Sequence, residues 1–164
     1  WVLLAASGAS RVTYGCRRDR KSARPGHYKA RFDIRAIATT AVVAARIASG
    51  GGILLDARAP ERFRGEVEPL DARAGHVPGA VNRWFQDNLA ADGSFLPAAE
   101  LARQFHDLLG AVPATEVVHM CGSGVTACHN LLAMEHAGLR GSRVYAGSWS
   151  EWVSEPSRPV ALGA

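Results

Sequence analysis

Short apolar runs alternate with longer amphipathic stretches along this chain, and this alternation limits its fold more than any other feature. Runs of strand length occur at 53–57, 116–120 and 142–146. Stretches with apolar residues at helical spacing occur at 34–48, 97–109 and 125–137. Glycines end the first and last of these stretches, as they commonly end helices. Strands that alternate with helices predict an α/β domain, with a central, mostly parallel sheet flanked by helices.

The segment between the first two strands is predicted from its turn-forming residues. Pro60 stands where a short helix would begin, a position that proline favours. Residues 65–80 are rich in glycine, proline and charge and are predicted to form a long loop. Residues 80–82 are predicted to form a further short strand.

Charge divides the chain into unequal parts. Of its 164 residues 48% are apolar and 21% charged, proportions typical of one soluble globular domain. The net charge of +4 is uneven, because residues 1–32 hold eight basic residues and one acid, whereas residues 33–164 hold 11 basic and 14 acidic ones. We therefore predict a basic, irregular lead-in or linker remnant at 1–32, a globular domain at 33–155 and a C-terminal tail at 156–164.

Cysteine number and hydropathy indicate the compartment. Three cysteines without framework spacing argue against a disulfide scaffold and favour a reducing compartment. No run reaches about 18 apolar residues, so no membrane partner is expected. A cytoplasmic location is predicted, with a mitochondrial one as the alternative if the Arg-rich lead-in is a transit peptide. The lead-in has few aromatic residues, so no nucleic-acid partner is expected either.

The chemistry of the chain is concentrated where the strand at 116–120 ends. Cys121 follows that strand, and Gly122, Ser123 and Gly124 separate it from the next helix. Parallel sheets bind ligands at the carboxyl ends of their strands, and glycine-rich turns let several N–H groups converge on an anion. Thiols at helix N-termini are more acidic than free thiols. Cys121 is therefore a candidate nucleophile, and the alternative is an inert buried cysteine.

Four ordered motifs resemble those of the rhodanese superfamily, in particular the C-terminal catalytic domain of the 3-mercaptopyruvate and thiosulfate sulfurtransferases. The first is the loop CGSGVTA at 121–127. The others are LDAR at 55–58 with ERFRG at 61–65, GHVPGAVN at 75–82, and VYAGSWSEW at 144–152. The resemblance covers about residues 50–155 and implies a rhodanese-like fold.

The resemblance also implies a mechanism. Cys121 would take sulfane sulfur from a donor, become a persulfide and pass the sulfur to a thiol, cyanide or another acceptor. Gly122, Ser123, Gly124, Val125 and Thr126 would then form the binding loop. Because this loop is neutral, the resemblance favours singly charged 3-mercaptopyruvate over dianionic thiosulfate.

Arginines are the candidates for binding the donor's carboxylate, since a guanidinium can hold a carboxylate through two parallel hydrogen bonds. By resemblance, Arg62 has this role. Relatives often carry a second arginine about nine residues later, where this chain has Asp71. Arg73 is the nearest basic residue and is the alternative for that second role. Asp56 is expected to cap the next helix or to make structural hydrogen bonds, and the alternative is that it orients Arg62.

A cysteine phosphatase, a zinc site and a partner-binding module are the alternatives to a sulfurtransferase. A cysteine phosphatase would need arginine where Ala127 stands, and the pair Cys128 and His129 lacks the spacing of a zinc site together with His119 and Cys121. No metal or cofactor is expected. The competing class is a truncated, weakly active or non-catalytic rhodanese-like module that binds partners. Relatives usually pair two such domains, so the expected partners, besides donor and acceptor, are a second rhodanese-like domain or a second copy of the chain.

Overall fold

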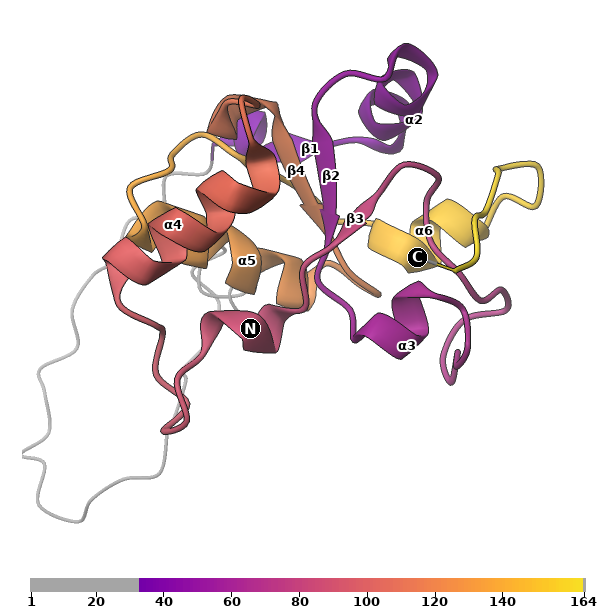
Figure 1. The fold of residues 1–164 in the computed structure, drawn as a ribbon. Coiled ribbons are helices and arrows are strands. Elements are labelled where there is room, and N and C mark those ends of the chain that lie inside the picture. The colour runs from indigo at the N-terminus through magenta and orange to yellow at the C-terminus, as the bar shows by residue number, and fades with distance from the viewer. Residues whose placement is uncertain (1–32, 164) are drawn as a thin grey trace, which may run out of the picture.

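The computed structural model describes residues 33–163, and in this range five strands form one sheet (Figure 1). The strands are β1 (Ile37–Ala38), β2 (Ile53–Asp56), β3 (Val81–Asn82), β4 (Val117–Met120) and β5 (Arg143–Tyr145). They lie in the order β1-β5-β4-β2-β3, and every neighbouring pair is parallel. The predicted α/β class is confirmed, and β4 lies at the centre of the sheet.

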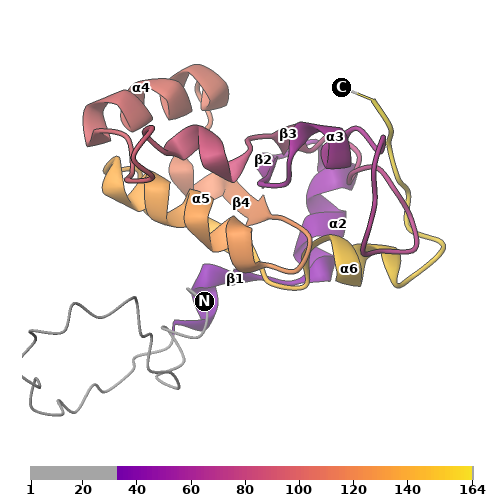
Figure 2. The ribbon, with the colours of Figure 1, turned by 90° about the horizontal axis from the view of Figure 1, so that it is seen from below.

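Helices cover both faces of this sheet. The α-helices are α2 (Thr40–Ser49), α3 (Pro60–Phe63), α4 (Ala98–Leu109), α5 (Val125–His136) and α6 (Ser148–Val153). Short 3-10 helices are η1 (Ile34–Ala36), η2 (Phe85–Asn88) and η3 (Ala114–Glu116). Helices α4 and α5 lie on one face, whereas α2 and α6 lie on the other (Figures 1 and 2).

Alternating side chains of β4 enter two separate cores. Val117 packs with residues of α4 and α5, such as Phe105. Val118 and Met120 pack on the other face with α2 and with Trp149 of α6. Side chains of a strand alternate between the two faces of a sheet, and helices cover both faces here, so all four residues of β4 are buried. This burial fixes the position at which the strand ends and Cys121 follows.

The helix predicted at 34–48 is wrong at its start. Ile37 and Ala38 instead form β1 and pair with Val144 and Tyr145 of β5. The helix begins only after Thr39, whose side chain accepts a hydrogen bond from the amide of Val42 at 3.4 Å and so caps it. A strand of two residues is too short to show a period of its own. Helix α6 was not predicted either.

The segment after residue 155 packs on the domain. His76 and Ala161 exchange two backbone hydrogen bonds of 2.9 Å, and the indole of Trp152 donates to the carbonyl of Pro159. The predicted lead-in at 1–32 lies outside the described residues. Within the described range, no helix is long and apolar enough to cross a membrane.

Candidate active site

Cys121 stands at the carboxyl end of the central strand, between β4 and α5. Its side chain is almost fully buried, and it packs with Ala57, Ala127 and Val144. It also lines a cavity at the carboxyl ends of β2 and β4. The thiol is therefore largely covered by protein and is approached through this cavity.

The start of α6 holds the backbone of the cysteine loop in place. The amide of Cys121 donates to Oγ of Ser148 at 3.0 Å, and the carbonyl of Cys121 accepts from the amide of Trp149 at 3.0 Å. The carbonyl of Gly122 accepts from both the amide and the hydroxyl of Ser150, each at 3.0 Å. Ser148 has a φ of 52°, which is unusual for a residue other than glycine. The sequence analysis missed this serine, because no local pattern marks a strained serine so far from the loop.

Gly124 makes the turn from the loop into α5. It has a φ of 83°, and a Cβ at this position would overlap the carbonyl oxygen of Ala146. Among the described residues, none accepts a hydrogen bond from the amides of Gly122, Ser123 or Gly124. These three amides are therefore available to an anion next to the thiol, as the sequence predicts.

The cavity at Cys121 has a volume of about 310 Å³. Its walls come from the β2–α3 turn, α3 and the loop after it, the segment after β3, the cysteine loop, the start of α5, and α6. They comprise Ala57, Arg58, Ala59, Arg62, Leu70, Asp71, Trp84, Phe85, Cys121, Gly122, Ser123, Val125, Thr126 and Ser150. Of the predicted site residues, Gly124 shapes the loop without lining this cavity, and Arg73 does not reach it.

Arg62 is the predicted arginine that the structure places beside the cysteine loop. Its Nη1 lies 3.5 Å from the position that a Cβ on Gly122 would take. Nη2 donates to Oε1 of Glu68 at 2.5 Å, and Oδ2 of Asp71 lies 3.8 Å away. The Nε atom is buried and has no partner within the described range. Nη1 has no partner within residues 33–163 either, so Arg62 can donate a hydrogen bond from this atom to a ligand beside the cysteine loop.

Arg58, which the sequence analysis did not single out, is the structural cation of this region. It is almost fully buried, and its Nη2 donates to Oδ2 of Asp56 and to the carbonyl of Gly75, each at 2.7 Å. Its guanidinium lies 4.6 Å from the ring centre of Trp149. Asp56 therefore makes structural hydrogen bonds, as expected, and does not contact Arg62. The Asp-x-Arg spacing after β2 is the signal that could have revealed this pair.

The structure places Arg73, the alternative for a second donor-binding arginine, outside the lining of the cavity at Cys121. Its Nη1 donates to the carbonyls of Pro156 and Arg158, at 3.2 and 3.0 Å. These carbonyls belong to the segment that follows α6, so the guanidinium is held away from Cys121. The cavity wall beside Arg62 instead contains Asp71.

Two further buried groups near Cys121 have structural surroundings. The Cys128 thiol donates to the carbonyl of Gly124 at 3.4 Å, and burial raises the pKa of this thiol. His119 is completely buried, its Nε2 lies 3.1 Å from Oγ of Ser142, and burial lowers its pKa to about 3. Cys128 therefore remains a thiol and His119 a neutral imidazole near neutral pH.

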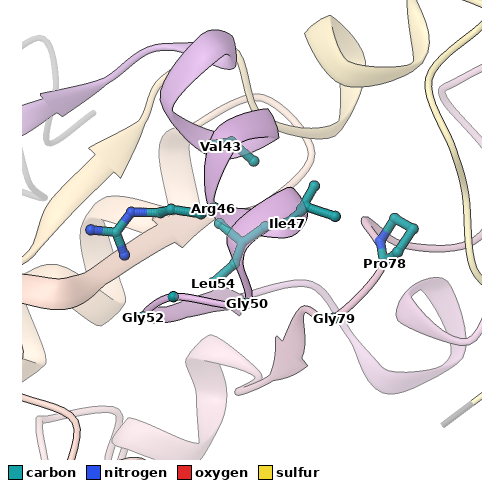
Figure 3. Close-up of a pocket in the computed structure, with 9 residues that line it drawn as sticks. Val43, Arg46, Ile47, Gly50, Gly52, Leu54, Pro78 and Gly79 are labelled. Atoms are coloured by element: carbon teal, nitrogen blue, oxygen red, sulfur yellow. The ribbon is translucent and has the colours of Figure 1, made fainter.

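A second hollow, of about 130 Å³, lies at the opposite end of the sheet (Figure 3). It is bounded by the end of α2, the glycines at 50–52, Leu54 at the start of β2, and Pro78. Its one charged side chain, Arg46, points toward Glu116 and pairs with it at 2.7 Å. This hollow offers no nucleophile, so the cavity at Cys121 is the candidate active site.

Comparison with known proteins gives consistent results. The rhodanese-like domain family matches residues 39–155. A Pseudomonas aeruginosa protein named "Probable 3-mercaptopyruvate sulfurtransferase" is 52% identical over 87% of this chain and 50% of its own length. A thiosulfate sulfurtransferase of Corynebacterium glutamicum is 34% identical over 70% of this chain and 40% of its own. This chain thus spans no more than half the length of these curated relatives.

Solved structures also resemble this fold. The crystal structure of the Tum1 protein from Saccharomyces cerevisiae superimposes with a TM-score of 0.68 and 25% sequence identity. That match covers 83% of this chain and 50% of the yeast chain.

Proposed function

Because this chain belongs to the rhodanese-like domain family, we propose that it is a sulfurtransferase domain acting through a Cys121 persulfide. The preferred donor is 3-mercaptopyruvate, with thiosulfate as the weaker one, and the acceptor is a thiol, cyanide or another nucleophile. The observation that carries this proposal is the cavity that Cys121 and Arg62 line together, beside a loop whose amides at 122–124 have no acceptor among residues 33–163.

The transfer has two displacement steps. The Cys121 thiolate attacks the sulfur of 3-mercaptopyruvate, the S–S bond forms, and the carbon–sulfur bond breaks. The electron pair of that bond leaves with pyruvate as its enolate, which takes up the proton of the donor's thiol. The acceptor then attacks the outer sulfur, and the S–S bond breaks to return the Cys121 thiolate. No oxidant or reductant is consumed.

Each part of the cavity has one task in these steps. Arg62 holds the donor's carboxylate through Nη1, which lies beside Gly122. The amides at 122–124 stabilise the negative sulfur before and after the transfer. Ser123 lines the cavity, and in this proposal its hydroxyl donates to the transferred sulfur. The fixed loop keeps these donors in place without reorganisation.

A thiocyanate assay tests the proposal. The protein is incubated with 3-mercaptopyruvate or thiosulfate plus cyanide, and thiocyanate is measured. Cys121→Ser is expected to abolish turnover, whereas the matched control Cys128→Ser, which changes the other buried cysteine, retains it. Mass spectrometry should show one added sulfur atom on Cys121 after donor alone. Absence of turnover with either donor, or an unaffected Cys121→Ser variant, would refute the function.

We also propose that the mouth of the cavity is completed by a second rhodanese-like domain. Leu70 and Val125 line the cavity and are 78% and 40% exposed, so apolar surface surrounds the entrance. The relatives are at least twice as long as the part of them that this chain matches. The molar mass in solution tests this reading, since a dimer broken by Leu70→Ser would show that a second copy of the chain takes that place.

A further inference from the structure

The carboxylates of Glu68 and Asp71 lie beside Arg62, and they differ in their hydrogen-bond partners. Glu68 is nearly buried, and its Oε1 accepts from Arg62 and from the amides of Leu70 and Asp71. Its Oε2 lies 3.4 Å from Arg58. Every oxygen of Glu68 thus has a partner inside the protein, and this residue holds the loop in place.

Asp71 has a different environment. It lines the cavity, and its side chain is only 12% exposed. Its Oδ2 lies 3.8 Å from Nη2 of Arg62, too far for a hydrogen bond, and has no hydrogen-bond partner among residues 33–163. A buried carboxylate oxygen without a donor is rare, because its desolvation is left uncompensated. Asp71 thus contributes to the cavity wall a carboxylate with one oxygen that no hydrogen bond from residues 33–163 satisfies.

The charges around Arg62 determine what can enter. Two arginines, at 58 and 62, face three carboxylates, at 56, 68 and 71, so this cluster carries one net negative charge. A ligand with one carboxylate can accept a hydrogen bond from Nη1 of Arg62, whereas Nη2 is bonded to Glu68. A second negative charge on the same ligand would lie in the cavity that Asp71 also lines, and like charges a few ångströms apart repel strongly in a partly buried site.

We infer that Asp71 sets the charge of the sulfur donor, admitting ligands with one negative charge and disfavouring those with two. This inference rests on the proposed sulfurtransferase function and names the residue that discriminates between its donors. Thiosulfate carries two negative charges and 3-mercaptopyruvate one. Asp71 is thus a specificity-determining residue and takes no part in the chemical steps.

Charge-removing variants of matched type test the inference. Asp71→Asn removes the carboxylate in the cavity, and Glu66→Gln removes one nearby that is exposed and paired with Arg64. One unit of charge a few ångströms away changes binding by about tenfold in such a site. In Asp71→Asn, kcat/KM for thiosulfate should therefore rise about tenfold more than kcat/KM for 3-mercaptopyruvate. The change should lie mainly in KM and shrink at high salt, whereas Glu66→Gln should leave the donor ratio unchanged.

A binding measurement gives a second readout that needs no turnover. Pyruvate and sulfate serve as probes with one and two charges. Sulfate should raise the melting temperature of Asp71→Asn more than that of the wild-type protein, and pyruvate should affect the two more equally. If the asparagine variant fails to fold, Asp71→Ser removes the same charge.

The outcomes separate the inference from the proposed function. If the wild-type protein turns over neither donor, the proposed function is refuted, and so is the inference that rests on it. A wild-type protein that is active, with a donor ratio unchanged in Asp71→Asn or shifted equally in Glu66→Gln, overturns the role of Asp71 alone.

Discussion

Replacing Gly124 with alanine tests whether the close approach of the cysteine loop to Ala146 holds the active site together. Gly138, just after α5, is a matched control, because both glycines have a φ of 83° but a Cβ at Gly138 would meet no atom within 4 Å. Left-handed backbone costs an L-residue roughly 1–2 kcal/mol, and this cost is common to both variants. At Gly124 the new Cβ also overlaps the carbonyl oxygen of Ala146, and such overpacking costs about 1–3 kcal/mol more.

Urea denaturation should therefore show Gly124→Ala to be destabilised more than Gly138→Ala, by about 1–3 kcal/mol. The effect on sulfur transfer should be larger still. A displaced Ala146 also moves Ser148, whose Oγ accepts from the amide of Cys121. A misplacement of about 1 Å costs about a hundredfold in rate, so kcat/KM should fall by that order in Gly124→Ala only. Equal stabilities within about 0.5 kcal/mol, or full activity of Gly124→Ala, would refute this reasoning.

Three further predictions concern buried and surface charges. Burial lowers the pKa of His119 to about 3, so between pH 6.5 and 3 the unfolded chain binds a proton that the folded chain does not. The wild-type protein therefore loses stability at this residue on acidification. Between pH 7 and pH 5, urea titrations should show that His119→Leu loses about 2 kcal/mol less unfolding free energy than the wild-type protein. Arg58→Ala should cost about 3–5 kcal/mol by leaving Asp56 unpaired in the core, whereas loss of exposed Arg64 should change the melting temperature little. Arg73→Ala should leave the KM for the donor unchanged, and a several-fold rise would return Arg73 to the donor site.

The parts of this site that local sequence determines could be predicted from sequence. A buried apolar run followed by Cys121, two glycines and an amphipathic stretch indicates a strand, a turn and a helix N-terminus, and the structure has all three. Each of these signals depends on neighbours within a few residues. The turn and the free amides around the cysteine follow from them.

The supports of the site depend on contacts that no local pattern reports. Ser148 is 27 residues from Cys121, and its strained backbone matters only because its hydroxyl meets the loop amide. Glu68 and Asp71 lie in an irregular loop, where no period shows which side chain turns inward. The sequence pattern predicts a helix at 34–48 and does not show β1, because two residues that pair with a distant strand leave no period to detect.

Residues 33–164 carry a net charge of −3, so the domain as a whole does not attract anions. An anionic donor must therefore be attracted by groups that lie close to it. Arg58 cannot supply it, because its guanidinium is committed to Asp56 and to the carbonyl of Gly75. Nη1 of Arg62 and the amides of the cysteine loop are what remains. Arg62, Gly122 and Ser123 line the cavity, where screening by salt is weaker than at the surface. At longer range the domain repels anions, so a ligand gains only once it has entered. One additional negative charge on the ligand therefore adds repulsion both outside the cavity and beside Asp71. The residues that bind a donor with one charge thus also disfavour a donor with two.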